Sequence, residues 1–256
     1  KQAARMILTD DNFGTLVHAV ELGRRVYDKV VSYVRYQMTQ LLSLIMLFVA
    51  ATAFNINQGE ALTPMMVLYL LFFVTASGVV VIAVDPGDPD VMLRPPRDPK
   101  MPITNRSAVI MWVIYGAALF IAALVPLVAG PDDLSIGTAS AAMTMTFAVM
   151  GLGTVFNAIT NRRDPTSGLS APVLKAAGIS VVPAAMIVLA TELPLLQRAL
   201  LTKSLTGPQW LAVIGLALIL PVVIEGSKLL RRRRLPAVVR PDAPHTVSPE
   251  RALATR

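Results

Sequence analysis

Amide and hydroxyl side chains interrupt the long apolar stretches of this chain, and they are its main candidates for chemistry. The six that we single out are Gln37, Gln40, Ser43, Thr75, Ser77 and Asn157. A cation that leaves water needs oxygen atoms in place of its hydration shell, and amides and hydroxyls carry such atoms. Gln37, Gln40 and Ser43 recur near helical spacing and could face one cavity with Thr75. Serine and threonine also bond their own helix backbone, and glutamine can join two helices, so packing is the stronger interpretation for each residue singly.

Other kinds of site find little support in the sequence. The chain has no cysteine, which excludes a thiolate metal site, and its two histidines, His18 and His245, lie far apart in the sequence. Asp10 and Asp11 are neighbours at a predicted helix entrance, where carboxylates suit capping better than catalysis. A glycine-rich phosphate loop is also missing. We therefore expect no catalytic residue and no cofactor in this segment, and we assign no metal ligand.

The composition predicts an all-α membrane protein. Of the 256 residues, 54% are hydrophobic and only 15% are charged, which is more apolar than an ordinary soluble domain. A bilayer core of about 30 Å needs roughly 20 apolar residues per helix. Six stretches qualify, at residues 30–53, 64–84, 107–129, 138–159, 173–193 and 209–229.

The positions of lysine and arginine predict that both termini are cytoplasmic, because cytoplasmic loops retain these residues. They gather in the second and fourth connectors and after the last span, at Arg94, Arg97, Lys100, Arg106, Arg162, Arg163, Lys228 and Arg231 to Arg234. The fifth connector, with Arg198 and Lys203, fits the pattern least well. The formal charge of +7 is thus explained by membrane topology, and we expect no nucleic-acid partner.

Residues 13–29 predict a helix that runs on into the first span without a breaker. Leu16, Val17, Val20 and Val26 recur at helical spacing, with charged residues between them. Such a helix could be a lever that links a soluble machine to a membrane site, or it could be a simple anchor. We divide the chain into residues 1–29, the six-helix domain 30–234, and a proline-rich tail, 235–256, which we expect to be disordered.

Several short motifs, taken in order, resemble the type II (calcium-pump-like) P-type cation-transporting ATPases. The start, with Ala3-Ala4, Leu8 to Phe13, Glu21 to Arg24 and Tyr27, is similar to the exit of their phosphorylation domain into the fifth membrane helix. The connector with Asp85-Pro86, Asp90 to Met92 and Arg94-Pro95-Pro96-Arg97 resembles the loop after their sixth helix. Pro194 to Gln197, Thr202, Leu205, Trp210, Glu225 and Lys228 resemble their ninth-to-tenth helix region.

This resemblance implies the C-terminal transmembrane region of an ATP-driven cation pump. Its catalytic parts, including the phosphorylated aspartate and the magnesium-handling segment, lie upstream in the family, so ATP and magnesium belong to the implied full-length protein. The implied partners are the lipid bilayer, the upstream nucleotide-binding, phosphorylation and actuator domains, and a transported cation that these residues do not identify. Glu21, Gly23 and Arg24 become candidates for stalk coupling. A bacterial plasma membrane suits the compact loops.

The sequence departs from the family pattern at the positions that usually hold the ion. With Tyr36 aligned, Leu41 and Leu44 replace the usual asparagine and glutamate of the fifth helix. On the sixth helix Leu71, Val74 and Thr75 stand at the usual asparagine, threonine and aspartate. A one-residue gap would instead place Thr75 on the threonine and Ala76 on the aspartate. Because calcium favours charged ligands among six to eight oxygens, a calcium site of the usual kind is not expected.

Two further functions remain as alternatives. One is a degenerate, non-pumping scaffold or regulatory module of the same family, which the leucines at the ligand positions would suit. The other is an unrelated channel or secondary carrier, but the sequence has no obvious inverted repeat.

Overall fold

The computed structural model describes residues 13–85, 89–93, 103–131, 138–161 and 172–234. Within these ranges the chain is helical and contains no strand. Six helices are long and apolar enough to cross a membrane, which confirms the predicted fold class and identifies an integral membrane protein. The bounds of the second to sixth spans differ from the predicted ones by at most three residues. The predicted tail and the Pro-Pro-Arg motif lie outside the described residues.

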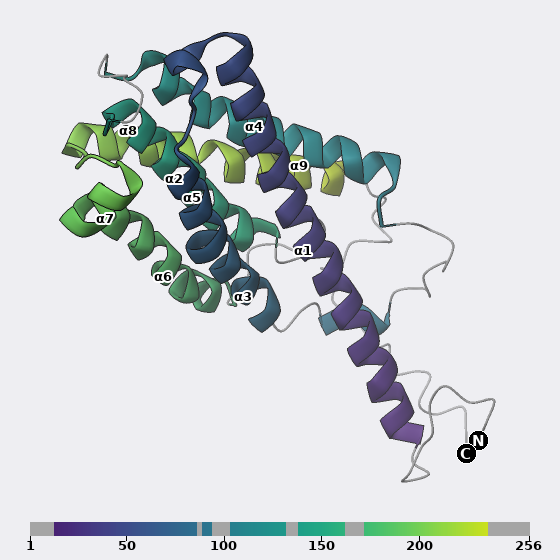
Figure 1. Ribbon diagram of the computed structural model, residues 1–256. Helices are drawn as coiled ribbons and strands as arrows, with labels where there is room; N and C mark the ends of the chain where they lie inside the picture. The colour runs from purple at the N-terminus through teal and green to yellow at the C-terminus, as the bar shows by residue number, and fades with distance from the viewer. Residues whose placement is uncertain (1–12, 86–88, 94–102, 132–137, 162–171, 235–256) are drawn as a thin grey trace, which may run out of the picture.

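The described elements follow one another in a simple up-and-down order (Figure 1). The first two spans are α1 (Phe13–Ala53) and a continuous run of α2 (Pro64–Tyr69), the π-helical turn η2 (Leu70–Thr75) and α3 (Ala76–Val84). The other spans are α4 (Arg106–Ala129), α5 (Ala141–Asn161), α6 (Pro172–Glu192), and the pair α8 (Gly207–Ala217) and α9 (Ile219–Arg234). Short helices occupy connectors: η1 (Ile56–Gly59), η3 (Pro89–Met92) and α7 (Pro194–Leu200).

Helix α1 joins the predicted stalk and the first span in one unbroken helix of 41 residues. Its N-terminal part projects beyond the bundle in Figure 1, with Phe13 and Val17 exposed to solvent. Its C-terminal part turns Tyr36, Ser43 and Leu47 into the bundle. The absence of proline allows this continuity, because no backbone N–H is missing from the ladder of i to i−4 hydrogen bonds.

Side-chain caps mark where several helices begin. The hydroxyl of Thr63 accepts from the Met66 amide at 3.2 Å ahead of α2, and the Asn105 side chain accepts from the Ala108 amide at 2.7 Å ahead of α4. Before α8 the Thr206 amide donates to the Gln209 side chain at 2.8 Å. Each contact satisfies an amide that the first turn of a helix leaves without an intrahelical partner.

Near the end of the chain, one connector contains a helix and one span is interrupted. The fifth connector contains the helix α7, which is capped after Leu200 by Leu201 in the left-handed conformation with φ 57°. The last span is broken at Leu218, between α8 and α9. The break falls three residues before Pro221, which has no N–H to donate to the carbonyl of Ala217.

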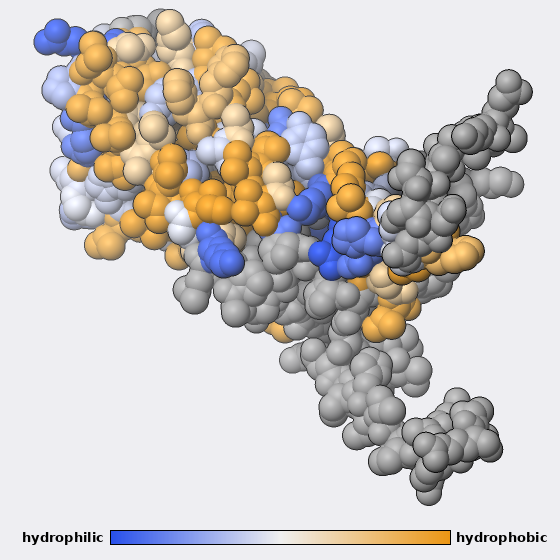
Figure 2. Space-filling model, turned by 90° about the horizontal axis from the view of Figure 1, so that it is seen from below, coloured by the Kyte–Doolittle hydropathy of each residue, from blue (hydrophilic) through white to orange (hydrophobic). Residues whose placement is uncertain are grey.

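Helix α5 is the centre of the bundle, packed against α1, α3, α4, α6, α8 and α9. Its most apolar 18-residue window is 89% buried, whereas those of the other five spans are 22% to 39% buried. Glycines permit this closeness: a Cβ at Gly153 would lie 2.4 Å from Leu119 Cδ1 of α4, and one at Gly151 would lie 2.7 Å from Ile187 Cδ1 of α6. The face of the bundle seen in Figure 2 carries many apolar side chains, which suit contact with lipid hydrocarbon.

Candidate functional site

Five buried polar residues lie where α1, α5 and η2 meet, and we call them the polar seam. They are Tyr36 and Gln40 on α1, Thr75 at the end of η2, and Thr154 and Asn157 on α5. Each is at most 4% exposed. Because a polar group away from water is costly unless it is hydrogen-bonded, the contacts within the seam determine how these helices can pack.

The α1 side of the seam bonds to both neighbouring elements. The Tyr36 hydroxyl donates to the carbonyl of Thr75 at 3.1 Å, and the Tyr36 carbonyl accepts from Asn157 Nδ2 at 3.2 Å. Asn157 Oδ1 in turn accepts from Asn161 Nδ2, one turn further along α5. Tyr36 therefore links the π-helical turn to α5 through its side chain and its backbone.

Gln40 and Thr154 form a second link between α1 and α5. Gln40 Oε1 lies in close contact with Thr154 Oγ1, and Thr154 Oγ1 also bonds to the carbonyl of Met150 at 2.7 Å. A hydroxyl has one hydrogen, so it cannot donate to both oxygens. If the nitrogen of the Gln40 side-chain amide faces Thr154, that nitrogen donates to Thr154 Oγ1. The single hydrogen of Thr154 Oγ1 then goes to the Met150 carbonyl.

The π-helical turn places Thr75 in the seam. The Ala76 amide donates to the Leu71 carbonyl five residues earlier, so this turn holds one residue more than an α-helical turn. Thr75 is buried, and its side chain lies beside the Tyr36 hydroxyl. Turns of this kind frequently occur at functional sites, and this one contributes the buried Thr75 hydroxyl to the seam.

The structure brings some of the predicted site residues together but not all of them. Gln40, Thr75 and Asn157 belong to the polar seam, whereas Gln37 is only half-buried. Ser43 is buried, but its hydroxyl bonds to the Gln40 carbonyl of its own helix at 2.8 Å. Ser77 similarly bonds to the carbonyl of Val74 at 2.7 Å. Both serines thus have the local backbone bonds considered in the packing interpretation.

The four apolar residues at the family's ligand positions do not converge on one point. Leu41 is 45% exposed and Leu71 is 39% exposed, so both face outward from this bundle. Leu44 packs against the hydrophobic core, and Val74 is completely buried in it. In the described part of the chain, no group of three or more His, Cys, Asp or Glu side chains could hold a metal ion. The seam itself offers uncharged oxygens.

The stalk part of α1 is bonded to the segment that follows α3. Arg24 donates to the Val91 carbonyl of η3 at 3.1 Å, and Lys29 donates to the Ala83 carbonyl near the end of α3 at 2.5 Å. Glu21 accepts from Arg25 at 2.5 Å one turn away. At Gly23 an added Cβ would meet no atom within 4 Å, so this position lies on an open face.

Sequence reasoning missed part of this arrangement. Tyr36 served only as a landmark for alignment, and Thr154 was not among the six candidates. Asn161, at the end of α5, received no role. The available signal was their spacing, because Thr154, Asn157 and Asn161 lie three and four residues apart and therefore share one helix face.

A bundle of six membrane-spanning helices, with polar groups buried between three of its elements, defines the membrane domain of a polytopic protein. Residues 59–230 match the family model described as "Cation transporting ATPase, C-terminus". The chain belongs to this family, and the resemblance to type II P-type ATPases is confirmed.

Individual relatives extend the similarity over most of the chain. A calcium-transporting ATPase of Bacillus subtilis (strain 168) is 25% identical over 241 residues, which cover 91% of this chain and 26% of the relative. The human calcium-transporting ATPase type 2C member 2 is 30% identical over 164 residues, covering 63% of this chain and 17% of the relative. Calcium-transporting ATPase 1 of Yarrowia lipolytica (strain CLIB 122 / E 150) is 25% identical over 240 residues, with coverages of 91% and 25%. The chain thus spans about a quarter or less of the length of these relatives.

Proposed function

We propose that this chain is the C-terminal part of the membrane domain of an ATP-driven cation pump, and that the polar seam contributes to its cation path. The observation that carries the proposal is the Thr75 hydroxyl, which is buried at a π-helical turn between α1 and α5. The family membership supports the pumping activity. Gln37, Ser43 and Ser77 are additional candidates along the same path.

The implied whole protein also contains nucleotide-binding, phosphorylation and actuator domains, which supply the ATP and magnesium chemistry. The residues described above bind and orient the cation, while the energy comes from those domains. We further propose that both termini are cytoplasmic and that the membrane is a bacterial plasma membrane, on the basis of the basic connectors and the compact loops.

The first experiment measures ATP hydrolysis by the complete protein that contains this chain. Vanadate-sensitive turnover is recorded in membranes against calcium, magnesium, manganese, potassium and sodium, and stimulation by one of them is expected. A folded protein that no cation stimulates would overturn the pumping function and favour the scaffold.

A pair of variants then tests the seam itself. Thr75→Val removes the buried hydroxyl with little change of shape, and we expect it to raise the half-saturating cation concentration. Thr39→Val is the matched control, because the Thr39 hydroxyl bonds to the Arg35 carbonyl of its own helix at 2.9 Å. If the half-saturating cation concentration were the same in both variants and in the parent protein, Thr75 would be excluded from the cation path.

The stalk is proposed to couple the soluble domains to the seam through its contacts with Ala83 and Val91. One alanine inserted after Val26 turns the preceding helix by about 100° relative to Lys29, which takes Arg24 away from Val91. Transport per ATP should fall while nucleotide binding is retained. Val17→Ala keeps the register and changes an exposed stalk side chain that is not a coupling candidate, so it serves as the control. If transport per ATP were unchanged in the insertion variant, the stalk would be only an anchor.

A further inference from the structure

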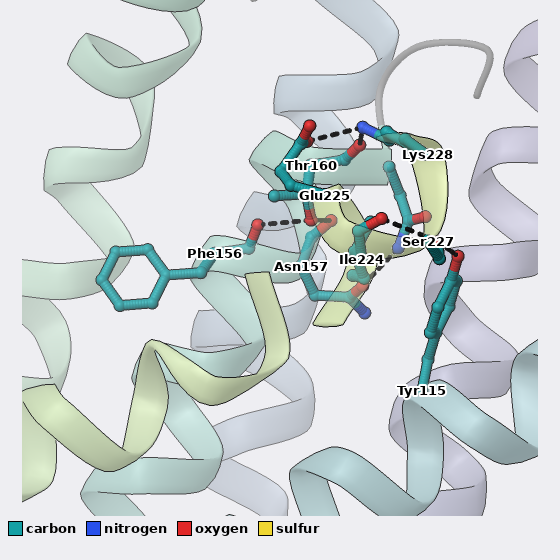
Figure 3. A network of polar contacts seen from close by, with 9 residues as sticks. Tyr115, Phe156, Asn157, Thr160, Ile224, Glu225, Ser227 and Lys228 are labelled. Carbon is teal, nitrogen blue, oxygen red and sulfur yellow. Dashed lines mark hydrogen bonds and ion pairs between the residues drawn. The ribbon is translucent and has the colours of Figure 1, made fainter. Parts of the chain in front are cut away.

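Lys228 on α9 carries an ammonium group in the interior of the helix bundle. Its side chain is 7% exposed, and its Nζ lies 2.8 Å from Glu225 Oε1 one turn earlier on the same helix. The same Nζ donates to the carbonyl of Thr160 on α5 at 2.7 Å (Figure 3). Burying a charge is expensive, so a lysine held here by a carboxylate and a backbone carbonyl calls for a functional account.

The contact with Thr160 lies at the end of α5. The last four carbonyls of an α-helix have no intrahelical partner, and the helix dipole makes that end favourable for a positive charge. Helix α5 ends at Asn161, so the Thr160 carbonyl is one of these four. Lys228 therefore closes the end of the most deeply buried span in the structure.

A second bond attaches the same turn of α9 to α4. Ser227 Oγ lies 2.5 Å from the Tyr115 hydroxyl (Figure 3). Lys228 and Ser227 thus hold α9 against α5 and α4, and the two bonds differ in kind. Only the bond of Lys228 involves a charge and reaches the helix that contributes to the polar seam.

The end of α5 is connected to the seam within one turn. The Thr160 hydroxyl donates to the Phe156 carbonyl at 2.9 Å and also lies 3.2 Å from the Asn157 carbonyl (Figure 3). The Asn157 side chain then donates to the Tyr36 carbonyl of α1 at 3.2 Å. A change at the Lys228 contact can therefore alter the direction in which Asn157 points.

We propose that Lys228 is a positioning residue for the cation path: its buried ammonium fixes the end of α5 and so sets Asn157 against α1. This inference rests on the proposed cation transport. The lysine does not touch the transported ion in this scheme. It acts through the backbone of α5, and Glu225 balances its charge.

The test compares variants in the complete protein. Lys228→Met keeps the length of the side chain and removes the charge. We expect it to raise the half-saturating cation concentration roughly two- to thirtyfold, the range typical of mutations along a coupled network of packed side chains and hydrogen bonds, with a much smaller change in maximal turnover. Lys228→Arg should restore most of the cation affinity. Lys175→Met, which removes an exposed lysine from α6, should leave both parameters unchanged.

Further variants separate positioning from stability alone. Tyr115→Phe removes the bond to Ser227 without touching the charge, and it should lower the melting temperature without changing cation affinity. If Lys228→Met is not recovered as folded protein, Glu225→Gln keeps the amine but removes its counter-charge, and it must also weaken cation affinity. If the half-saturating cation concentration were unchanged in Lys228→Met, the positioning role would be overturned. If Lys228→Met is not recovered, an unchanged value in Glu225→Gln would overturn it. A parent protein that no cation stimulates would overturn the proposed function instead, and this inference with it.

Discussion

Gly78 on α3 is the position where one added methyl group should disturb the seam most. A Cβ there would lie 2.2 Å from the Tyr36 hydroxyl oxygen, 2.8 Å from its Cζ and 3.3 Å from Ala158 Cβ. Because Tyr36 is completely buried, its ring has little room to move. Overpacking costs about 1–3 kcal/mol, and losing the Tyr36 bond to Thr75 costs about 1 kcal/mol. Alanine regains about 1 kcal/mol in helix propensity, which leaves a net destabilisation of about 1–3 kcal/mol.

The assay for Gly78→Ala is the free energy of unfolding of this chain in mixed micelles titrated with sodium dodecyl sulfate. Gly178→Ala in α6 is the matched control, because an added Cβ there would meet no atom within 4 Å. Combining Gly78→Ala with Tyr36→Phe removes the oxygen atom nearest to the new methyl group. We therefore expect the double variant to be about 1 kcal/mol more stable than the sum of the single effects predicts.

Two outcomes would refute this reasoning. If Gly78→Ala were as stable as Gly178→Ala, the close approach of α3 and α1 would be wrong. If the effects of Gly78→Ala and Tyr36→Phe simply added, the clash would not involve the tyrosine hydroxyl.

Two other substitutions test the packing of α5 and the start of α2. Gly153→Ala should destabilise the chain by about 1–2 kcal/mol in the same titration, because its Cβ would lie 2.4 Å from Leu119 Cδ1; Leu119→Val should recover part of this loss, and no recovery would contradict the contact. Thr63→Val should cost about 1 kcal/mol, because it removes the acceptor for the Met66 amide and the donor to the Leu200 carbonyl at 3.3 Å. Faster hydrogen exchange at the Met66 amide is expected, and an unchanged rate would show that the cap has little effect.

The spans could be predicted because each needs only a long apolar run, and such runs are local in the sequence. The continuity of α1 followed from the absence of proline. In contrast, α7 was read as connector, because its seven residues are too few for a periodic pattern. The left-handed backbone conformation at Leu201 could not be predicted either, because the residue there is not glycine.

The polar seam was only partly predictable, because its pairs come from helices that are distant in the sequence. Gln40 stood out as polar within an apolar run, but nothing local names Thr154 as its partner. The π-helical turn has the sequence Leu-Leu-Phe-Phe-Val-Thr, with no glycine or proline to mark it. Its extra residue lies in the same segment where the two family alignments differed by one position, at Thr75 or Ala76.

The depth at which α5 is buried bears on how the protein is made. A helix that carries Thr144, Thr146, Thr154 and Asn157 is a weak candidate for entering the bilayer alone during synthesis, since each polar side chain lowers its tendency to partition from the translocon into lipid. Thr146 obtains its partner from α4, and Thr154 and Asn157 obtain theirs from α1. Both helices are synthesised earlier than α5. We therefore expect α5 to be held by these helices before it settles in the membrane, so that early misassembly would expose α5 first to membrane quality-control proteases.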